Sequence, residues 1–183
     1  MPPTVRSQIE TAASAESVFE PVCQLFAEVF GAPPLSRSAE ALAAQRRGLR
    51  SLMVEPGFGM ATAWDGEQLA SFAYGHALNA QTHWWDNFLT PVASEITREW
   101  DGRTFAVIDM AVARSRQGAG VGRQLLDTLL ESRPEERASL AVVHDNDQAH
   151  GFYRRLGWQH VGRVKGASHH TAPLFDMYVL RLR

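Results

Sequence analysis

The sequence contains very little cysteine, no excess of charge of one sign and no long hydrophobic run. A single cysteine, Cys23, among 183 residues excludes an internal disulfide and a cysteine-based zinc cluster. The 18 basic and 20 acidic residues give a net charge of -2, whereas nucleic-acid-binding proteins are typically strongly basic. No apolar run approaches the roughly 20 residues that span a bilayer, and residues 1–14 lack the apolar core of a signal peptide. We therefore expect a cytoplasmic protein that binds neither nucleic acid nor membrane.

The sequence does contain enough apolar material for one core. Hydrophobic residues make up 45% and charged residues 21% of the chain, and both values are ordinary for a globular domain. A domain typically has about 150 residues, and no linker, repeat or low-complexity tract divides this chain. We expect a single domain over residues 1–183.

The first half of the chain predicts a strand, two helices and a β-hairpin. Residues 17–20 (Ser-Val-Phe-Glu) match a capping box, which predicts a helix that begins there, has Pro21 in its first turn and ends at Gly31. Asp65-Gly66 predicts a type I′ hairpin turn between two alternating segments. The predicted elements are a strand at 4–10, helices at 17–30 and 38–53, and strands at 58–64 and 68–78.

The second half of the chain alternates strands with helices. Residues 104–113 are the most strand-like segment, and an amphipathic helix is predicted over 120–132. A strand at 138–144, a helix at 147–156 and strands at 158–164 and 175–182 follow. This alternation predicts an α/β fold with a parallel strand pair flanked by helices.

A glycine-rich loop joins the strand at 104–113 to the helix at 120–132. Gly118, Gly120 and Gly122 leave the backbone bare, and the first amides of a helix have no partner within it. Such a loop favours binding of a phosphate group. It lacks the Gly-Lys-Ser/Thr run of a P-loop, and Arg123 stands where a Rossmann fingerprint has its third glycine. On the loop alone, a turn that only allows close packing of helix and strand is an equal alternative.

Two segments resemble the signatures of the GNAT acyltransferase superfamily. Residues 117–122 (Gln-x-x-Gly-x-Gly) match its acyl-coenzyme A signature, and residues 146–158 (Asn-x-x-Ala-x-x-Phe-Tyr-x-x-x-Gly-Trp) are similar to its second signature. The single strand between the two is also typical of the family. The resemblance covers residues 105–158. It implies a six- to seven-stranded mixed sheet of the α/β type, with splayed central strands and helices on both faces.

The resemblance also implies acetyl-CoA as the co-substrate. Main-chain groups of Met110 and Val112 would bond the pantetheine arm, and the amides of the glycine loop would hold the pyrophosphate. Asn146 would bond the pantetheine arm, and Tyr153 would reach the thioester sulfur. The family's usual proline at the loop's entry is Arg114 here, so the geometry of that entry stays open. The expected cofactor-binding residues are Met110, Ala111, Val112, Gln117, Gly118, Ala119, Gly120, Val121, Gly122, Arg123, Asn146 and Tyr153.

Acyl transfer to an amine needs a neutral amine, a stabilised oxyanion and a proton for the departing thiolate. Tyr153 is the expected proton donor, and the Met110 amide the expected oxyanion ligand. Asp109 is the expected general base, because it is an acid within an apolar strand, where burial would raise its pKa. An Asp109 that bonds the backbone or faces solvent is an equal alternative. His144 and His76 are the next candidates for the base, and catalysis without a side-chain base also stays open.

Aromatic and histidine residues outside the signatures predict the acceptor pocket. Trp84 and Trp85 lie in an irregular segment and can wall such a pocket, although at least one of them can instead fill the space under a long loop. Segment 166–173 contains two adjacent histidines, but no ligand pattern completes a metal site around them. We expect no metal, and we assign Trp84, Trp85, His76 and His169 to substrate binding.

The sequence therefore predicts an N-acetyltransferase that moves an acetyl group from acetyl-CoA directly to a primary amine of a small molecule, through a tetrahedral intermediate. One alternative is an enzyme that acylates a protein or peptide amine or uses a larger acyl thioester. The other is a module that binds coenzyme A without turnover. Tyr153 and Asp109 favour catalysis over binding alone. A homodimer is compatible with each of these expectations.

Overall fold

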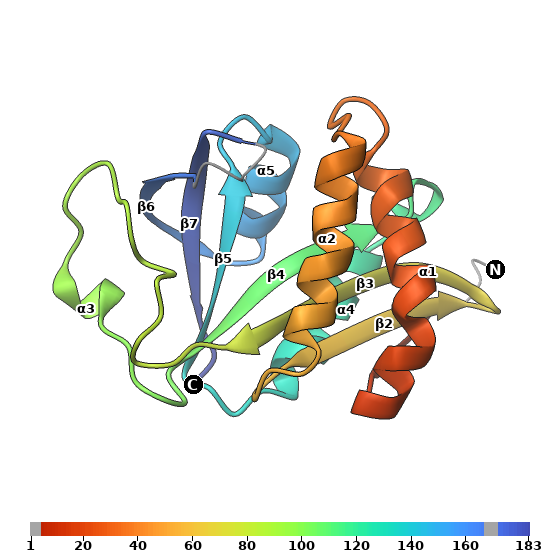
Figure 1. The fold of residues 1–183 in the computed structure, drawn as a ribbon, viewed down its shortest axis with the longest axis horizontal. Coiled ribbons are helices and arrows are strands. Elements are labelled where there is room, and N and C mark those ends of the chain that lie inside the picture. Colours follow the sequence, from red (N-terminus) through yellow and green to blue (C-terminus); the bar gives the residue numbers. More distant parts are fainter. Residues whose placement is uncertain (1–4, 167–171) are drawn as a thin grey trace. The chain divides into compact units, whose positions relative to one another are not determined.

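The chain forms a seven-stranded mixed β-sheet with helices, in the strand order β1-β2-β3-β4-β5-β7-β6 (Figure 1). The structure is a computed structural model, and it describes residues 5–166 and 172–183. In that part of the chain, no helix is both long and apolar enough to cross a membrane. The elements are β1 (Arg6–Ile9), α1 (Ala12–Phe30), α2 (Ala39–Leu52), β2 (Gly59–Asp65), β3 (Gln68–Ala77), α3 (Ser94–Thr97), β4 (Thr104–Val112), the 3-10 turn η1 (Arg114–Arg116), α4 (Val121–Glu131), β5 (Arg137–Val143), α5 (Asp147–Arg155), β6 (Gln159–Lys165) and β7 (Leu174–Arg181).

The chain divides into two compact units. The first unit contains Met1–His76 and Ile108–Arg133, and the second contains Ala77–Val107 and Pro134–Arg183. Strand β4 contributes its first half to the second unit and its second half to the first. The expectation that residues 1–183 act as a single domain stays a prediction.

In the first unit, α1 and α2 cover one face of strands β2 and β3, and α4 lies against β1 and β2 (Figure 1). Strands β1, β2 and β3 pair in antiparallel order. Met60, Phe72 and Tyr74 share a buried cluster with Phe26 of α1 and Leu49 of α2. Because successive side chains of a strand point to opposite faces, the residues that alternate with Met60 on β2 and with Phe72 and Tyr74 on β3 face the side of α4. The expected arrangement of helices on both faces is confirmed for this unit.

In the second unit, β5 pairs in parallel with the start of β4 and in antiparallel with β7. The parallel ladder joins residues 104–106 to residues 137–139, and β6 completes this part of the sheet by pairing with β7. Trp85, Val164 and Met177 form a buried cluster beneath the long segment that contains α3. The predicted parallel pair is confirmed, and its short ladder agrees with strands that splay apart.

Helix α1 begins earlier than the sequence predicted. Its N-cap is Thr11, which forms a capping box with Ser14, and Pro21 lies in the interior of the helix. The predicted start at Ser17 is therefore wrong. The buried stripe continues back from Val18 to Ala15, so packing against the sheet stabilises an extra turn that the local capping pattern did not reveal.

The β2–β3 turn also differs from the prediction. Asp65 pairs with Gln68, so the two loop residues are Gly66 and Glu67, and of these only Gly66 has a positive φ, +60°. A type I′ turn requires positive φ at both central residues, and that prediction is wrong. Glycine at the first central position fits a type II′ turn, which spares Glu67 the cost of the left-handed region.

Candidate functional site

The glycine loop between η1 and α4 is exposed and open. Residues 117–120 are exposed, and Gly118 and Gly120 have φ values of +76° and +81°. A Cβ atom placed on either glycine would meet no atom within 4 Å. Gly120 is the N-cap of α4, and no side chain of the described residues caps this helix. The two glycines are thus required by their backbone conformation and not by close packing, which removes the main support for a loop that only serves packing.

Three polar side chains hold the entry to this loop. Arg116 forms an ion pair with Asp65, at the β2–β3 turn of the same unit. Gln117 Nε2 donates to the Val112 carbonyl over 3.0 Å, which ties the loop to the end of β4. Arg114, which replaces the family's usual proline, donates to a main-chain carbonyl of the α1–α2 loop. The entry to the loop is therefore fixed by side-chain contacts in place of the proline ring.

Asp109 on β4 belongs to a hydrogen-bonded chain within the first unit. The Tyr74 hydroxyl donates to the Asp109 carboxylate, and Gln45 Nε2 on α2 donates to the Tyr74 oxygen over 3.0 Å. Gln45 and Tyr74 are buried, and Asp109 is half-buried. Asp109 thus bonds a buried tyrosine, an arrangement that differs from both of the structural alternatives considered from the sequence. Sequence reasoning missed Tyr74 and Gln45, because neither lies near Asp109 in the chain.

Burial raises the pKa of Asp109 to about 6. The hydrogen bond from Tyr74 and the positive charge of Arg37 both lower this pKa, so burial is the larger effect. Burial and the neighbouring Asp109 raise the pKa of Tyr74 well above its ordinary value, so its hydroxyl stays protonated and remains a donor. A carboxylate with a pKa near 6 is ionised at neutral pH and is a stronger base than an ordinary aspartate, as a general base requires.

The expected cofactor residues of β4 follow Asp109 directly. Met110 and Val112 are half-buried, and Ala111 is buried. The Ala111 carbonyl accepts a hydrogen bond from Ser71 Oγ over 2.7 Å, which places it within the sheet. Contact of this strand with a pantetheine arm stays a prediction.

The second unit contains the expected residues of the second signature. Asn146 is the N-cap of α5, where its Oδ1 accepts from the Ala149 amide over 3.1 Å. Its Nδ2 is a donor and does not take part in this cap. Tyr153 on α5 is half-buried, and its ring packs edge-on against Trp158 with centroids 5.8 Å apart. The proposed contacts of Asn146 and Tyr153 with the cofactor stay predictions.

Asp176 on β7 gathers several cationic or titratable side chains of the second unit. This buried carboxylate accepts from His144 Nδ1 and His160 Nε2, each over 2.8 Å, and from Arg163 Nε over 3.1 Å. Burial works against the ionised form, yet these three hydrogen bonds hold the pKa of Asp176 below its ordinary value. His144, a sequence candidate for the base, therefore has a fixed ring. Sequence reasoning missed Asp176, although an acid within an apolar strand was the same signal that identified Asp109.

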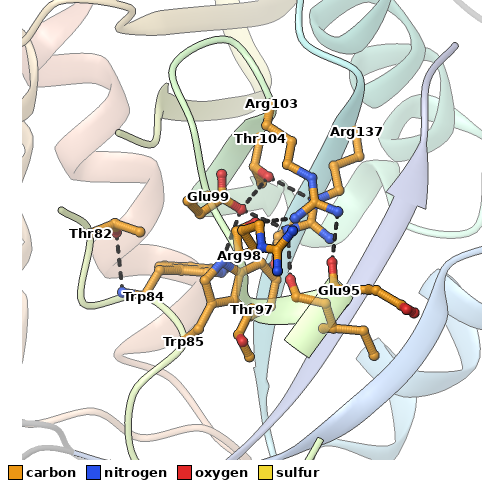
Figure 2. A network of polar contacts seen from close by, with 12 residues as sticks. Thr82, Trp84, Trp85, Glu95, Thr97, Arg98, Glu99, Arg103, Thr104 and Arg137 are labelled. Carbon is orange, nitrogen blue, oxygen red and sulfur yellow. Dashed lines mark hydrogen bonds and ion pairs between the residues drawn. The ribbon is translucent and has the colours of Figure 1, made fainter. Parts of the chain in front are cut away.

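The two tryptophans expected at the acceptor pocket are anchored in the second unit (Figure 2). Trp85 is buried and donates its Nε1 hydrogen to Glu99 Oε1 over 3.0 Å. Trp84 is half-buried and donates its Nε1 hydrogen to Ser139 Oγ on β5 over 2.9 Å. Both side chains therefore secure the segment that follows β3, and contact with a substrate stays a prediction.

The remaining expected site residues are His76 and His169. His76 is half-buried near the end of β3, in the first unit. His169 lies outside the described residues. Across residues 5–166 and 172–183, no group of three His, Cys, Asp or Glu side chains could hold a metal ion. The predicted loop, the β4 residues and Asp109 thus share the first unit, whereas Asn146, Tyr153, Trp84 and Trp85 belong to the second.

Comparison with known sequences identifies one family and one curated relative. The profile of the "Acetyltransferase (GNAT) family" matches residues 20–158. N-alpha-acetyltransferase RimI of Mycobacterium tuberculosis is 39% identical over 80 residues, which cover 38% of this chain and 51% of the relative. The chain thus spans about half the length of this curated relative.

Solved structures of acetyltransferases share the fold. NAA60 of Arabidopsis thaliana in complex with acetyl-CoA aligns with a TM-score of 0.69 at 15% identity, over 97% of this chain and 98% of that chain. The ribosomal-protein-S18-alanine N-acetyltransferase of Escherichia coli aligns with a TM-score of 0.67 at 14% identity, over 98% of this chain and 94% of that chain. At these identities the likeness establishes the fold. Because the family profile spans both signatures and more than half of the sequence, the chain belongs to the acetyltransferase (GNAT) family.

Proposed function

We propose that the protein transfers the acetyl group of acetyl-CoA to a primary amine. The observation that carries this proposal is the family match over residues 20–158, which contains both signature segments. The glycine loop supports it, because an exposed backbone and a helix start without a side-chain cap suit the pyrophosphate of the cofactor.

The proposed cofactor contacts follow the two signature segments and the end of β4. The amides of residues 117–122 would hold the pyrophosphate, and the main chain of Met110 and Val112 would bond the pantetheine arm. Asn146 has a side-chain donor for the same arm, since only its oxygen is used in capping α5. Tyr153 would donate a proton to the sulfur as the carbon–sulfur bond breaks.

Asp109 is proposed to accept the proton of the attacking amine as the nitrogen–carbon bond forms. The carboxylate has a pKa of about 6. Taking a proton from an α-ammonium group of pKa ~7.8 would then cost ~2.5 kcal/mol, against ~6 kcal/mol for a lysine-like ammonium of pKa ~10.4. The Met110 amide would stabilise the oxyanion of the tetrahedral intermediate, a role for which one donor typically contributes ~3 kcal/mol.

This difference favours an α-amine over a lysine-like amine as the acceptor. The N-termini of proteins present such amines, and so do small molecules whose α-carboxyl group is amidated. The relative in Mycobacterium tuberculosis is named for N-alpha acetylation, and the Escherichia coli neighbour for an alanine of ribosomal protein S18. These names support a protein or peptide N-terminus as a second candidate beside the small-molecule amine.

A thiol-release assay with acetyl-CoA tests the proposal. The acceptors are a small α-amine, a short peptide with a free N-terminus, the same peptide with a blocked N-terminus and one lysine, and an aminoglycoside. We expect release with at least one of the two α-amines and much less with the blocked peptide. Release that does not depend on any acceptor, or no release at all, would contradict the proposed function. Preference for the lysine peptide would contradict the assignment of an α-amine.

A further inference from the structure

Arg37 lies in the loop between α1 and α2, against two phenylalanine rings. Its guanidinium carbon is 4.5 Å from the ring centre of Phe30 and 5.5 Å from that of Phe26. The Arg37 amide donates to the Phe30 carbonyl over 2.8 Å, and the Pro33 carbonyl accepts a hydrogen bond from Arg114. The loop is therefore held at two points of the first unit, and the Arg37 side chain is positioned by its aromatic contacts.

The guanidinium group of Arg37 has five donors to satisfy. Across residues 5–166 and 172–183, its side chain makes no hydrogen bond and no ion pair within 4.0 Å. The residue is half-buried, and burial lowers the pKa of Arg37, while the negative charge of Asp109 acts in the opposite direction. Because withdrawing a charged group from water is costly without a partner, an unpartnered guanidinium in this setting points to a ligand.

Two other arginines of the described chain that lie over aromatic rings have acidic partners, whereas Arg103, over the Trp100 ring, donates to main-chain carbonyl groups. Arg50 in α2 pairs with Glu16 over 2.6 Å. Arg137 in β5 pairs with Glu99 over 2.6 Å. Contact with a ring therefore does not by itself take the place of an acceptor in this protein, and Arg37 differs from both of these residues.

Arg37 is connected to the proposed base through the buried cluster of the first unit, because it lies over the ring of Phe26. Phe26 and Tyr74 belong to one buried cluster, and the Tyr74 hydroxyl donates to Asp109. We propose that Arg37 binds a carboxylate that the acceptor carries beside its reactive amine. This inference rests on the proposed function, because it assigns the acceptor of the same reaction.

The two opposite charges match the two ends of such an acceptor. Asp109 attracts the ammonium group and takes its proton, while the planar fork of Arg37 can bind a carboxylate through two parallel hydrogen bonds. The carboxylate can be the α-carboxylate of a free amino acid or the acidic side chain of the first residue of a peptide. A site built to bond this group would discriminate against an acceptor that lacks it.

The test is steady-state kinetics of the full chain with four acceptors. L-alanine is compared with L-alaninamide, and a C-terminally amidated peptide that begins with Asp is compared with the same peptide beginning with Asn. The variant Arg37→Met keeps the apolar stem over the phenylalanine rings and removes the charge. Arg46→Met is the matched control, because Arg46 also lies over a ring, that of Phe19, but pairs with Glu20 at the surface.

We expect Arg37→Met to raise KM for one carboxylate-bearing acceptor by about tenfold or more, as is typical when one partner of a desolvated charge pair is removed. Its uncharged counterpart and acetyl-CoA should keep their KM values within about twofold. Each acceptor is judged by its variant-to-wild-type ratio, which cancels differences in amine pKa. A raised KM for L-alanine would identify a free amino acid as the acceptor. A raised KM for the Asp peptide would identify an acidic N-terminal residue. Arg46→Met should leave all four values unchanged.

Four outcomes would overturn the inference. Equal ratios for charged and uncharged acceptors would show that Arg37 does not bind a carboxylate. A raised KM for acetyl-CoA with unchanged acceptor values would assign Arg37 to the cofactor. Wild-type transfer that is indifferent to the carboxylate would leave the proposed function intact and contradict the inference, whereas no transfer to any acceptor would contradict both. Thermal unfolding of Arg37→Met, with Arg37→Lys as the variant that retains the charge, separates a folding defect from lost binding.

Discussion

Asp109 is expected to set the acid limb of the pH–rate profile. Burial raises its pKa to about 6, so kcat/KM for an acceptor that binds as an ammonium ion should fall as the pH drops below about 6. Asp109→Asn should lower kcat/KM by about 100-fold or more, which is typical for loss of a general base, and should abolish this limb. Initial rates between pH 5 and pH 8 measure both effects.

Tyr74→Phe is the control that links the acid limb of the pH–rate profile to the hydrogen bond between Tyr74 and Asp109. The hydrogen bond from Tyr74 lowers the pKa of Asp109, so its removal should move the limb to higher pH. A limb that stays in place in Tyr74→Phe, or that persists in Asp109→Asn, would show that another group titrates there.

Asp109→Asn should also stabilise the fold at pH 7.5. A carboxyl whose pKa is raised on folding favours the protonated state in the native protein, so its ionisation destabilises the fold as the pH rises from 3.8 through about 6. The variant removes this penalty, and its advantage in melting temperature should be larger at pH 7.5 than at pH 4.5. Thermal unfolding at the two pH values tests this, and an equal change at both would contradict the raised pKa.

Part of this chemistry was accessible from single residues. An acid within an apolar strand identified Asp109, because such a residue must be buried or specifically bonded. Its partners were not accessible, because Tyr74 lies on another strand and Arg37 in the α1–α2 loop. The pair of tryptophans indicated a pocket, and the structure adds that the Trp85 side chain is buried and bonded to Glu99, while its contact with a substrate stays a prediction.

At the scale of elements, the glycine loop depends on the left-handed N-cap of α4. Gly120→Ala places a side chain at φ +81° with open space around it, so we expect a stability loss of about 1–2 kcal/mol from backbone strain alone. The altered loop should also raise KM for acetyl-CoA several-fold. Chemical denaturation and steady-state kinetics measure the two effects.

Gly102→Ala is the matched control for this variant. Gly102 has a φ of +87°, also has open space around it, and belongs to a turn outside the glycine loop. It should lose similar stability with an unchanged KM. An equal change in KM for both variants would show that the loop has no special role in cofactor binding.

The segment that follows β3 depends on the ion pair between Glu99 and Arg137 (Figure 2). Glu99 Oε1 accepts from Trp85, Thr104 and Arg137, and the Glu99 and Arg137 side chains are 2% and 10% exposed. Glu99→Ala should destabilise the protein by about 3–5 kcal/mol, because Arg137 would be left as a buried charge without its partner. Glu99→Gln keeps an acceptor for Trp85 and Thr104 and should cost less. Equal losses in urea denaturation would contradict this explanation.

Local sequence signals located most elements but not all of their ends. Ser38 and Gly120 cap the helices where the sequence predicted, because their capping depends on residues within one turn. The start of α1 was missed because two overlapping capping patterns compete there, and packing of Ala15 and Val18 decides between them. The hairpin turn was missed because its type depends on which residues pair across the strands.

At the scale of the whole molecule, two motifs and the order of elements identified the family. Strand order was not accessible in the same way, since pairing of β5 with β7 joins residues far apart in the chain. The division of β4 between two compact units was likewise not predicted from local patterns. Both features depend on contacts between residues far apart in the chain, which the local hydrophobic periodicity of the sequence does not predict.

The proposed function depends on the amides of residues 117–122, of which residues 117–120 are exposed, binding the diphosphate of acetyl-CoA. Isothermal titration calorimetry of the purified chain with acetyl-CoA tests it most directly. We expect saturable one-to-one binding with a Kd of about 1–100 μM, within the range of enzyme substrates. A titration without heat at several temperatures, at protein concentrations well above that range, would contradict it.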